Sequence, residues 1–288
     1  MDPLRIGVVS LINTLPLIRG LEKGIPGDYE LVYSSPSALS DRLRYGELDV
    51  ALIPAVECFR GVGDGIVPKL CIASQGPTES MRFLVNEPID QVQNVYVDQA
   101  SRTSVAMLRL LFHKSYRRNP DFHTYRPNPE NPLLGPDGQP AEAVMVTGDW
   151  VMELQESAAK LVIDLGEWWQ NTYHRPFVYA LWVYRNRTGG EDLGRELIPL
   201  LHESYRVGLR EIPLICEEIA LAREWSENFV HDYLTRRIQY KLDKDNLAGL
   251  QLFHQLCVEN FLAPPRPEIG QQLQALEIEP EQLAKPLL

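Results

Sequence analysis

The sequence predicts an α/β protein in two parts, with mostly parallel sheets flanked by helices and a helical C-terminal region. Short β-rich runs alternate with helical stretches between Ile6 and Trp182, which is the pattern of a parallel sheet with helices on its faces. From Glu191 onward the apolar spacing is helical only. The chain has 288 residues, which at roughly 100–200 residues per domain fits two domains or one large one.

The first strand–helix series covers the chain up to Ser74. Apolar, β-branched runs bounded by turn residues predict its strands, and 3.6-residue spacing predicts its helices, of which the second has Ser37 as a plausible N-cap. The expected strands are Ile6–Ser10, Tyr29–Ser34, Val50–Ile53 and Leu70–Ser74, and the expected helices are Leu15–Lys23 and Ser37–Tyr45.

The second series lies between two further β-rich runs, Met81–Val85 and Phe177–Trp182. Its expected strands are Val95–Val97, Ala143–Val146 and Leu161–Asp164, its expected helices are Thr103–His113 and Asp149–Glu156, and its surface loop is Pro127–Pro140. If both bracketing runs cross between lobes, one lobe contains residues 1–86 and 177–288, the other contains residues 87–176, and the hinge lies near 82–87 and 174–180. Periodicity alone does not decide whether they cross.

The C-terminal part is expected to consist of long amphipathic helices. Three segments show the spacing: Leu193–Leu209, Pro213–Leu234 and Leu247–Phe261. The second begins with a proline, which a first helical turn tolerates.

Composition excludes several classes of protein. The formal net charge is −11, from 28 Lys and Arg against 39 Asp and Glu residues, whereas nucleic-acid binding requires a basic footprint. No apolar run approaches the ~18 residues of a membrane span. The four cysteines stand far apart with no CxxC pair, which fits buried reduced thiols better than a zinc site or disulfide framework. Because no signal-peptide pattern is present either, we expect a cytoplasmic protein.

Familiar cofactor and metal motifs fail on inspection. The run Gly61–Gly65 lacks the third glycine of a dinucleotide-binding loop, and Asp243–Leu247 breaks the calcium-loop pattern, so that a helix cap is the better interpretation. The six histidines form no close cluster. We therefore expect neither a metal nor a cofactor.

Polar residues at strand ends are the remaining candidates for a site. In an open α/β sheet, ligands bind beyond the carboxyl ends of the strands, where helix N-termini offer free N–H groups and roughly half a positive charge. Each of these residues taken singly is more simply a helix cap, but three such ends facing one cleft favour an anion site. The candidates are Ser10, Asn13 and Thr14 after the first strand, Ser101, Thr103 and Ser104 after Val95–Val97, and Gly148 and Asp149 after Ala143–Val146.

These segments resemble a known family, the chorismate dehydratases of the futalosine route of menaquinone biosynthesis. The matching landmarks keep the family's order along the chain. They are Arg5–Leu17, Gly46–Pro54, Val97–Val105, Thr147–Asp149, Asp164–Trp168 and Pro176–Trp182.

The resemblance implies a fold, a reaction and two catalytic residues. The fold is the two-lobed type II periplasmic-binding-protein fold, and the reaction is a lyase reaction that dehydrates chorismate to 3-[(1-carboxyvinyl)oxy]benzoate without a cofactor. Asn13 matches the family's catalytic asparagine and Ser80 its catalytic serine, with Ser74 as the alternative to Ser80. The other candidates at the strand ends, among them Ser10, Thr14 and Asp149, would then bind substrate. Its two carboxylates would be held by Ser101, Thr103, Ser104 and the backbone of Gly148.

Three alternatives stay open. The first is 1,4-dihydroxy-6-naphthoate synthase, which shares the fold and pathway, but in which a Cys-Pro-Asn-Asp-like segment is expected where this chain has Leu11–Thr14. The second is a non-enzymatic small-anion-binding protein, and the third is a regulatory effector-binding module. The sequence leaves the oligomeric state open.

Overall fold

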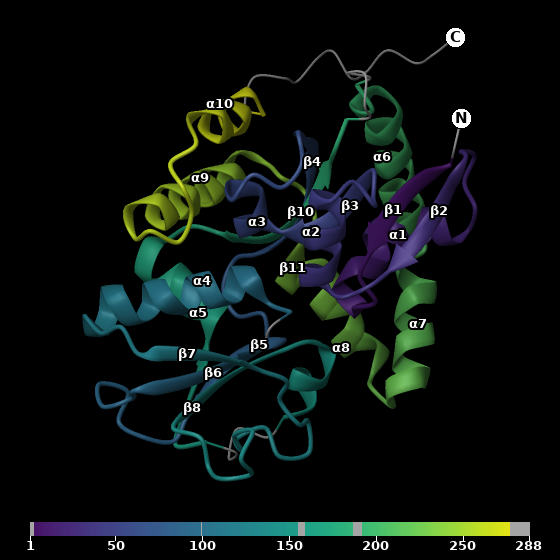
Figure 1. Ribbon diagram of the computed structural model, residues 1–288. Coiled ribbons are helices and arrows are strands. Elements are labelled where there is room, and N and C mark those ends of the chain that lie inside the picture. Colours follow the sequence, from purple (N-terminus) through teal and green to yellow (C-terminus); the bar gives the residue numbers. More distant parts are fainter. Residues whose placement is uncertain (1–2, 99, 155–158, 187–191, 277–288) are drawn as a thin grey trace.

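The computed structural model describes residues 3–98, 100–154, 159–186 and 192–276. These residues form two β-sheets, each with its own helices (Figure 1). The larger sheet has the strand order β11-β4-β10-β3-β1-β2, and the smaller has the order β7-β6-β8-β5-β9. The α/β class with C-terminal helices is therefore confirmed.

The larger sheet is built from both ends of the chain. β1 is parallel to β2 and β3, β10 is antiparallel to β3 and β4, and β11 is antiparallel to β4. The strands are β1 (Leu4–Val8), β2 (Tyr29–Tyr33), β3 (Val50–Pro54), β4 (Gly65–Ser74), β10 (Phe177–Tyr184) and β11 (Ile238–Gln239).

The smaller sheet comes from the middle of the chain. β6 is parallel to β7 and β8, and β5 is antiparallel to β8 and β9. The strands are β5 (Met81–Val85), β6 (Asn94–Asp98), β7 (Asp121–Tyr125), β8 (Ala143–Thr147) and β9 (Leu161–Asp164). The sheets are less uniformly parallel than expected, because β5 and β10, the first strands after each change of sheet, run against their neighbours.

The helices cover the sheets and fill the C-terminal third. They are η1 (Ile12–Thr14), α1 (Leu15–Glu22), α2 (Pro36–Arg44), α3 (Ala55–Phe59), α4 (Arg102–Leu111), η2 (Phe112–Tyr116), η3 (Asp149–Glu153), α5 (Leu165–Tyr173), α6 (Gly194–Arg210), α7 (Ile212–Arg223), α8 (Glu227–Asp232), η5 (Tyr233–Arg237), α9 (Lys244–Glu259) and α10 (Pro267–Ala275). As expected, the Asp243 carboxylate caps α9 by accepting from the N–H groups of Asp245 and Asn246.

Three local expectations need correction. The N-cap of α2 is Ser35 rather than Ser37, because the Ser35 hydroxyl accepts from the N–H of Ala38. The helix expected over Pro213–Leu234 breaks at Glu224, whose backbone is left-handed (φ 57°), and restarts behind the Ser226 cap.

The helix expected over Asp149–Glu156 is a 3₁₀ helix that ends at Glu153. The last part of that expectation, from residue 155, lies outside the described residues.

The change from one sheet to the other comes earlier than the expected boundary at residue 86. Met81–Val85 pairs along its whole length with β8 and β9, so the chain has already entered the smaller sheet at Met81. The first connection between the sheets is therefore the segment after Ser74, and the second lies between Asp164 and Phe177.

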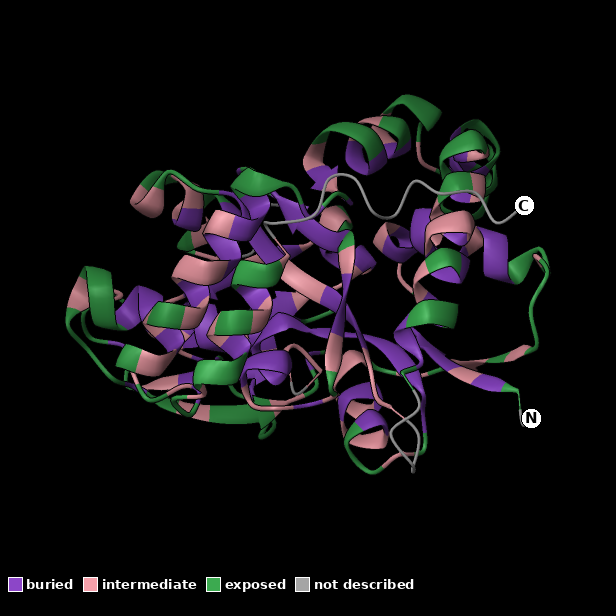
Figure 2. Cartoon of the chain, turned by 90° about the horizontal axis from the view of Figure 1, so that it is seen from above, coloured by how far each residue is buried: buried purple, intermediate pink, exposed green. Residues whose placement is uncertain are grey.

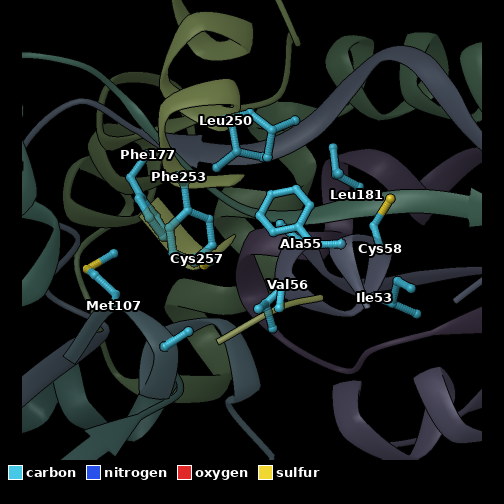
Figure 3. Close-up of a cluster of buried hydrophobic side chains, with 14 of the residues drawn as sticks. Ile53, Ala55, Val56, Cys58, Met107, Phe177, Leu181, Leu250, Phe253 and Cys257 are labelled. Carbon is cyan, nitrogen blue, oxygen red and sulfur yellow. The ribbon is translucent and has the colours of Figure 1, made fainter. Parts of the chain in front are cut away.

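One apolar core joins the two parts of the molecule. Buried residues of both sheets belong to the same cluster, in which α4 supplies Met107, α3 supplies Val56 and α9 supplies Phe253 (Figure 3). Buried segments run along the strands and the inner faces of the helices, while exposed residues lie on the outer helix faces (Figure 2). A second cluster packs α1 and α6 against the larger sheet.

Helix α1, which follows the first strand, packs tightly against α6. A Cβ on Gly208 would lie 2.0 Å from the carbonyl oxygen of Pro16, and one on Gly20 would lie 2.4 Å from the Cα of Ser204. This contact fixes the start of α1 and, with it, the loop that carries Asn13.

The four cysteines are buried and free, as expected. Within the described ranges, no helix is both long and apolar enough to cross a bilayer.

Candidate functional site

A cavity of about 490 Å³ lies between the two sheets, at the ends of their strands. Both parts of the chain line it, with hydroxyl-bearing side chains set among apolar ones. Its lining residues are Val9, Ser10, Leu11, Asn13, Tyr33, Ser34, Ser35, Pro36, Thr78, Ser80, Met81, Asp98, Ala100, Ser101, Ser104, Thr147, Gly148, Asp149, Tyr179 and Ile238.

The loop after β1 places Asn13 on the cavity wall. The Thr14 hydroxyl donates to the carbonyl oxygens of Val9 (2.6 Å) and Leu11 (2.7 Å), which holds the turn into η1. Asn13 Oδ1 is buried and has no hydrogen-bond partner within the described residues. A buried amide oxygen without a partner costs free energy, so this acceptor is available to a ligand.

Ser80 is fixed from the side of the smaller sheet. The Asp164 carboxylate accepts from the N–H groups of Thr78 (2.9 Å) and Glu79 (2.8 Å), and the N–H of Gly148 donates to the carbonyl oxygen of Ser80 (3.0 Å). Burial raises the pKa of Asp164, and these backbone donors oppose that rise. Ser80 thus enters the cavity from a segment with a fixed backbone.

A hydroxyl pair lies at the start of α4. The Oγ of Ser101 and the Oγ1 of Thr147 are 2.6 Å apart, and Thr147 also donates to Asp98 (3.2 Å). Ser101 does not cap α4, since its hydroxyl accepts from no helix N–H. The first N–H groups of α4 therefore face this end of the cavity without a side-chain cap.

Asp149 links the smaller sheet to the loop after β1. Its carboxylate accepts from the N–H of Ile12 at 3.1 and 3.3 Å. Burial raises the pKa of Asp149 to about 6, against the lowering effects of the Ile12 N–H and the nearby Arg223 guanidinium. The side chain expected to bind substrate is thus already engaged in holding the two walls of the cavity together.

The structure gathers nearly all the predicted site residues. Two of the nine are exceptions: Thr14 and Thr103 line a smaller adjoining cavity of about 110 Å³, and Thr103 Oγ1 accepts from the N–H of Val56 (3.3 Å). Ser74 lies outside both linings and bonds to Tyr179, so the geometry favours Ser80 over Ser74. The seven that line the larger cavity are Ser10, Asn13, Ser80, Ser101, Ser104, Gly148 and Asp149.

Sequence reasoning missed several residues at the site. Tyr179 lines both cavities from β10, where its alternation with apolar neighbours looks like ordinary strand patterning. Tyr233 donates to Ser80 Oγ (3.1 Å) from η5, where nothing in its helical spacing distinguishes it from a core residue. Asp98 and Thr147 also line the cavity, and both lie at the ends of strands. Their positions at strand ends could have identified them from the sequence.

Among the described lining residues there is no lysine or arginine. The two arginines that follow lining residues in the chain are occupied elsewhere: Arg102 pairs with Asp41 and Glu57, and Arg82 donates to the carbonyl oxygen of Leu154. An anion in this cavity would be held by N–H and hydroxyl donors.

No group of three or more His, Cys, Asp and Glu side chains in the described ranges is arranged to hold a metal ion.

Comparison with known proteins assigns the chain to a family. Residues 4–259 match the protein family described as menaquinone biosynthesis. The chain belongs to this family. It is also similar to the chorismate dehydratase of Thermus thermophilus, with 25% identity over 271 residues, which are 88% of this chain and 94% of that protein.

Solved structures show the fold. A protein from Archaeoglobus fulgidus superposes with a TM-score of 0.69 at 14% identity, covering 90% of this chain and 98% of its own. The periplasmic aliphatic sulphonate binding protein SsuA of Escherichia coli superposes with a TM-score of 0.60 at 15% identity, covering 100% of this chain and 96% of its own. The periplasmic-binding-protein fold expected for this member of the menaquinone biosynthesis family is confirmed.

Proposed function

We propose that the protein is a carbon–oxygen lyase that dehydrates chorismate to 3-[(1-carboxyvinyl)oxy]benzoate, as a step of the futalosine route to menaquinone. One observation carries the proposal: Asn13 and Ser80 come from different parts of the chain and line one cavity between the sheets. Membership of the menaquinone biosynthesis family and similarity to a chorismate dehydratase support it.

The reaction needs no strong protein base. The C3 hydrogen of chorismate is vinylogous to the ring carboxylate, so it is acidified, and loss of this proton and of the C4 hydroxyl makes the ring aromatic. In our proposal the substrate's enolpyruvyl carboxylate takes the C3 proton, the C4–O electron pair leaves with oxygen, and the C3 proton completes the water. The protein holds these groups in reacting geometry, which lowers a barrier by several kcal/mol.

The cavity suits a dianion in spite of the chain's charge. The uncapped start of α4 offers N–H groups, and Ser101, Ser104 and the backbone of Gly148 line the same wall. Helix N-termini bind carboxylates through such groups. We assign the two substrate carboxylates to this wall, with Ser10 opposite.

Closure of the two lobes would exclude water during the reaction. We keep as a proposal that the lobe built on the larger sheet moves against the lobe built on the smaller sheet, about the two connections between the sheets. The pairing of β5 with β8 and β9 supports placing the first pivot nearer the segment after Ser74.

The decisive experiment is incubation of the purified protein with chorismate, followed by mass spectrometry against a protein-free control. We expect a product lighter by one water with the spectrum of a meta-substituted benzoate. Asn13→Ala should lower kcat while chorismate still binds. Unchanged chorismate from a folded sample would reject the proposal and leave the naphthoate synthase reaction and simple anion binding to be tested.

A further inference from the structure

Tyr233 lies between the two residues that the proposed reaction uses. Its side chain is fully buried, and its hydroxyl donates to Ser80 Oγ at 3.1 Å. The Asn13 side chain also interacts with this phenol. An ion pair between Arg237, on the same helical turn η5, and Glu79 holds the turn against the segment that carries Ser80. Three distant segments of the chain thus meet at one hydroxyl.

The bond from Tyr233 decides what Ser80 can do. A serine hydroxyl has one hydrogen to donate and two lone pairs to accept with. Because Tyr233 donates to Ser80 Oγ, one lone pair is filled and the serine hydrogen must point elsewhere. Ser80 lines the cavity, so its hydrogen is available to an acceptor on a bound ligand.

The same phenol decides what Asn13 can do. A side-chain hydrogen bond joins Asn13 to the Tyr233 hydroxyl. Because Asn13 Oδ1 has no partner in the described part of the chain, the amide nitrogen makes this bond, and an amide N–H can only donate. The amide oxygen then faces away, and Asn13 Oδ1 is buried without a partner among the described residues. Asn13 therefore offers an acceptor, where Ser80 offers a donor.

Tyr233 stays a neutral phenol in this arrangement. Burial raises its pKa well above the ordinary value, and the Ser80 and Asn13 side chains offset only part of that rise. It therefore keeps its proton near neutral pH and acts as a fixed hydrogen-bond donor.

We propose that Tyr233 is a positioning residue that gives Ser80 and Asn13 opposite hydrogen-bonding polarity toward one substrate oxygen, the leaving C4 hydroxyl. This inference rests on the proposed function. The hydroxyl hydrogen of the substrate is donated to Asn13 Oδ1, and the oxygen accepts from Ser80. As the C4–O bond breaks, its electron pair stays on oxygen, the Ser80 hydrogen bond strengthens, and the proton taken from C3 completes the departing water.

The test compares Tyr233→Phe with a matched control, Tyr240→Phe. Tyr240 is also buried, but its hydroxyl has no partner within the described residues and lies outside both cavity linings. We expect Tyr233→Phe to lower kcat about 10- to 100-fold, the effect of losing a hydrogen bond to a group that becomes charged. KM should change less than about twofold. The dissociation constant of the dehydrated product should not change, because the product lacks the C4 hydroxyl. Tyr240→Phe should match the wild type in all three quantities.

The outcomes separate this inference from the function on which it rests. If the wild type does not dehydrate chorismate, the proposed function fails. If the wild type is active and Tyr233→Phe keeps its kcat, the polarity inference fails alone. Equal losses in kcat and in product affinity would also overturn it, because they would indicate a general structural role.

A second measurement tests the inference without Tyr233→Phe, in case that variant does not fold. The Tyr233 hydroxyl proton of the labelled wild-type protein should give an NMR resonance protected from solvent. That resonance should shift in Ser80→Ala, which removes the hydroxyl that accepts from it. An unchanged resonance would overturn the inference.

Discussion

The two sheets meet in two regions that differ in chemistry. On one side, α3, α4 and α9 close around Val56, Met107 and Phe253, all three fully buried (Figure 3). On the other side, hydroxyl groups, the Asn13 amide and two carboxylates, with apolar side chains between them, line a cavity of about 490 Å³. The apolar contact therefore holds the two parts together, while the cavity side leaves room for a ligand. The following substitutions test this division.

The largest effect is expected from Phe253→Ala on the apolar side. The Phe253 ring packs against Trp169 (centroids 5.8 Å apart, perpendicular) and Phe177 (4.7 Å), so truncation leaves a cavity that its neighbours cannot fill. Urea denaturation should show a loss of about 3–5 kcal/mol in the free energy of unfolding. The control Leu221→Ala, at a side chain 84% exposed, should change it by less than about 0.5 kcal/mol. A loss below about 1 kcal/mol for Phe253→Ala would contradict the division.

Ser80→Ala is the matching change on the polar side. It should lower kcat for chorismate about 100-fold, or about 2.7 kcal/mol in activation free energy, because a donor to the departing oxygen is lost. The free energy of unfolding should fall by about 1–3 kcal/mol, because the buried Tyr233 hydroxyl loses its acceptor. Steady-state kinetics and urea denaturation on the same preparation check both numbers. A variant that is destabilised but fully active would reverse the assignment.

Thr103→Val tests the place where the two regions join, because Thr103 lines the smaller cavity and also contacts α3. Its hydroxyl accepts from the N–H of Val56, and valine would leave that buried N–H without a partner. We expect a loss of about 1–3 kcal/mol in unfolding free energy with KM for chorismate unchanged. An increase in KM without a loss of stability would contradict this structural role and indicate that Thr103 contacts substrate.

The smallest effect concerns the ionisation of Asp149. The unfolded carboxyl loses its proton near pH 3.8, whereas burial keeps the folded one protonated to about pH 6. Its ionisation therefore makes stability fall as pH rises from 3.8 to 6, with no further change above. Arg223→Ala should raise this pKa by less than about one unit, because the lost guanidinium is half-exposed and 4.0 Å away. A ¹³C NMR titration of the carboxyl measures it, and a lowered pKa would exclude an attraction between the two groups.

Hydrophobic patterns and turn residues in the sequence predicted those strands, helices and strand ends that depend on neighbouring residues in the chain. The first strand and the polar residues behind it are marked by a change from apolar to hydroxyl-bearing residues, and seven predicted site residues do line the cavity. The pairing of Met81–Val85 with the smaller sheet was not predictable, since a short apolar strand fits either sheet equally well. The break at Glu224 was missed because its left-handed backbone leaves no mark in helical spacing.

Tyr233 shows the same limit at the site. It comes more than 150 residues after Ser80 in the chain, and its value lies in a hydrogen bond across that separation. Apolar periodicity reports which face of a helix is buried, and it says nothing of which polar atom the buried tip reaches.

The place of β10 has a consequence for synthesis on the ribosome. This strand lies between β3 and β4 and pairs with both, so those two earlier strands have no partner in common until residues 177–184 exist. The smaller sheet, by contrast, is complete once Asp164 has been made. Domains fold as units as the chain emerges, so the smaller sheet is expected to form first and the larger sheet to close around its returning strand. The cavity then acquires the last of its described lining residues, Ile238, only when β11 emerges.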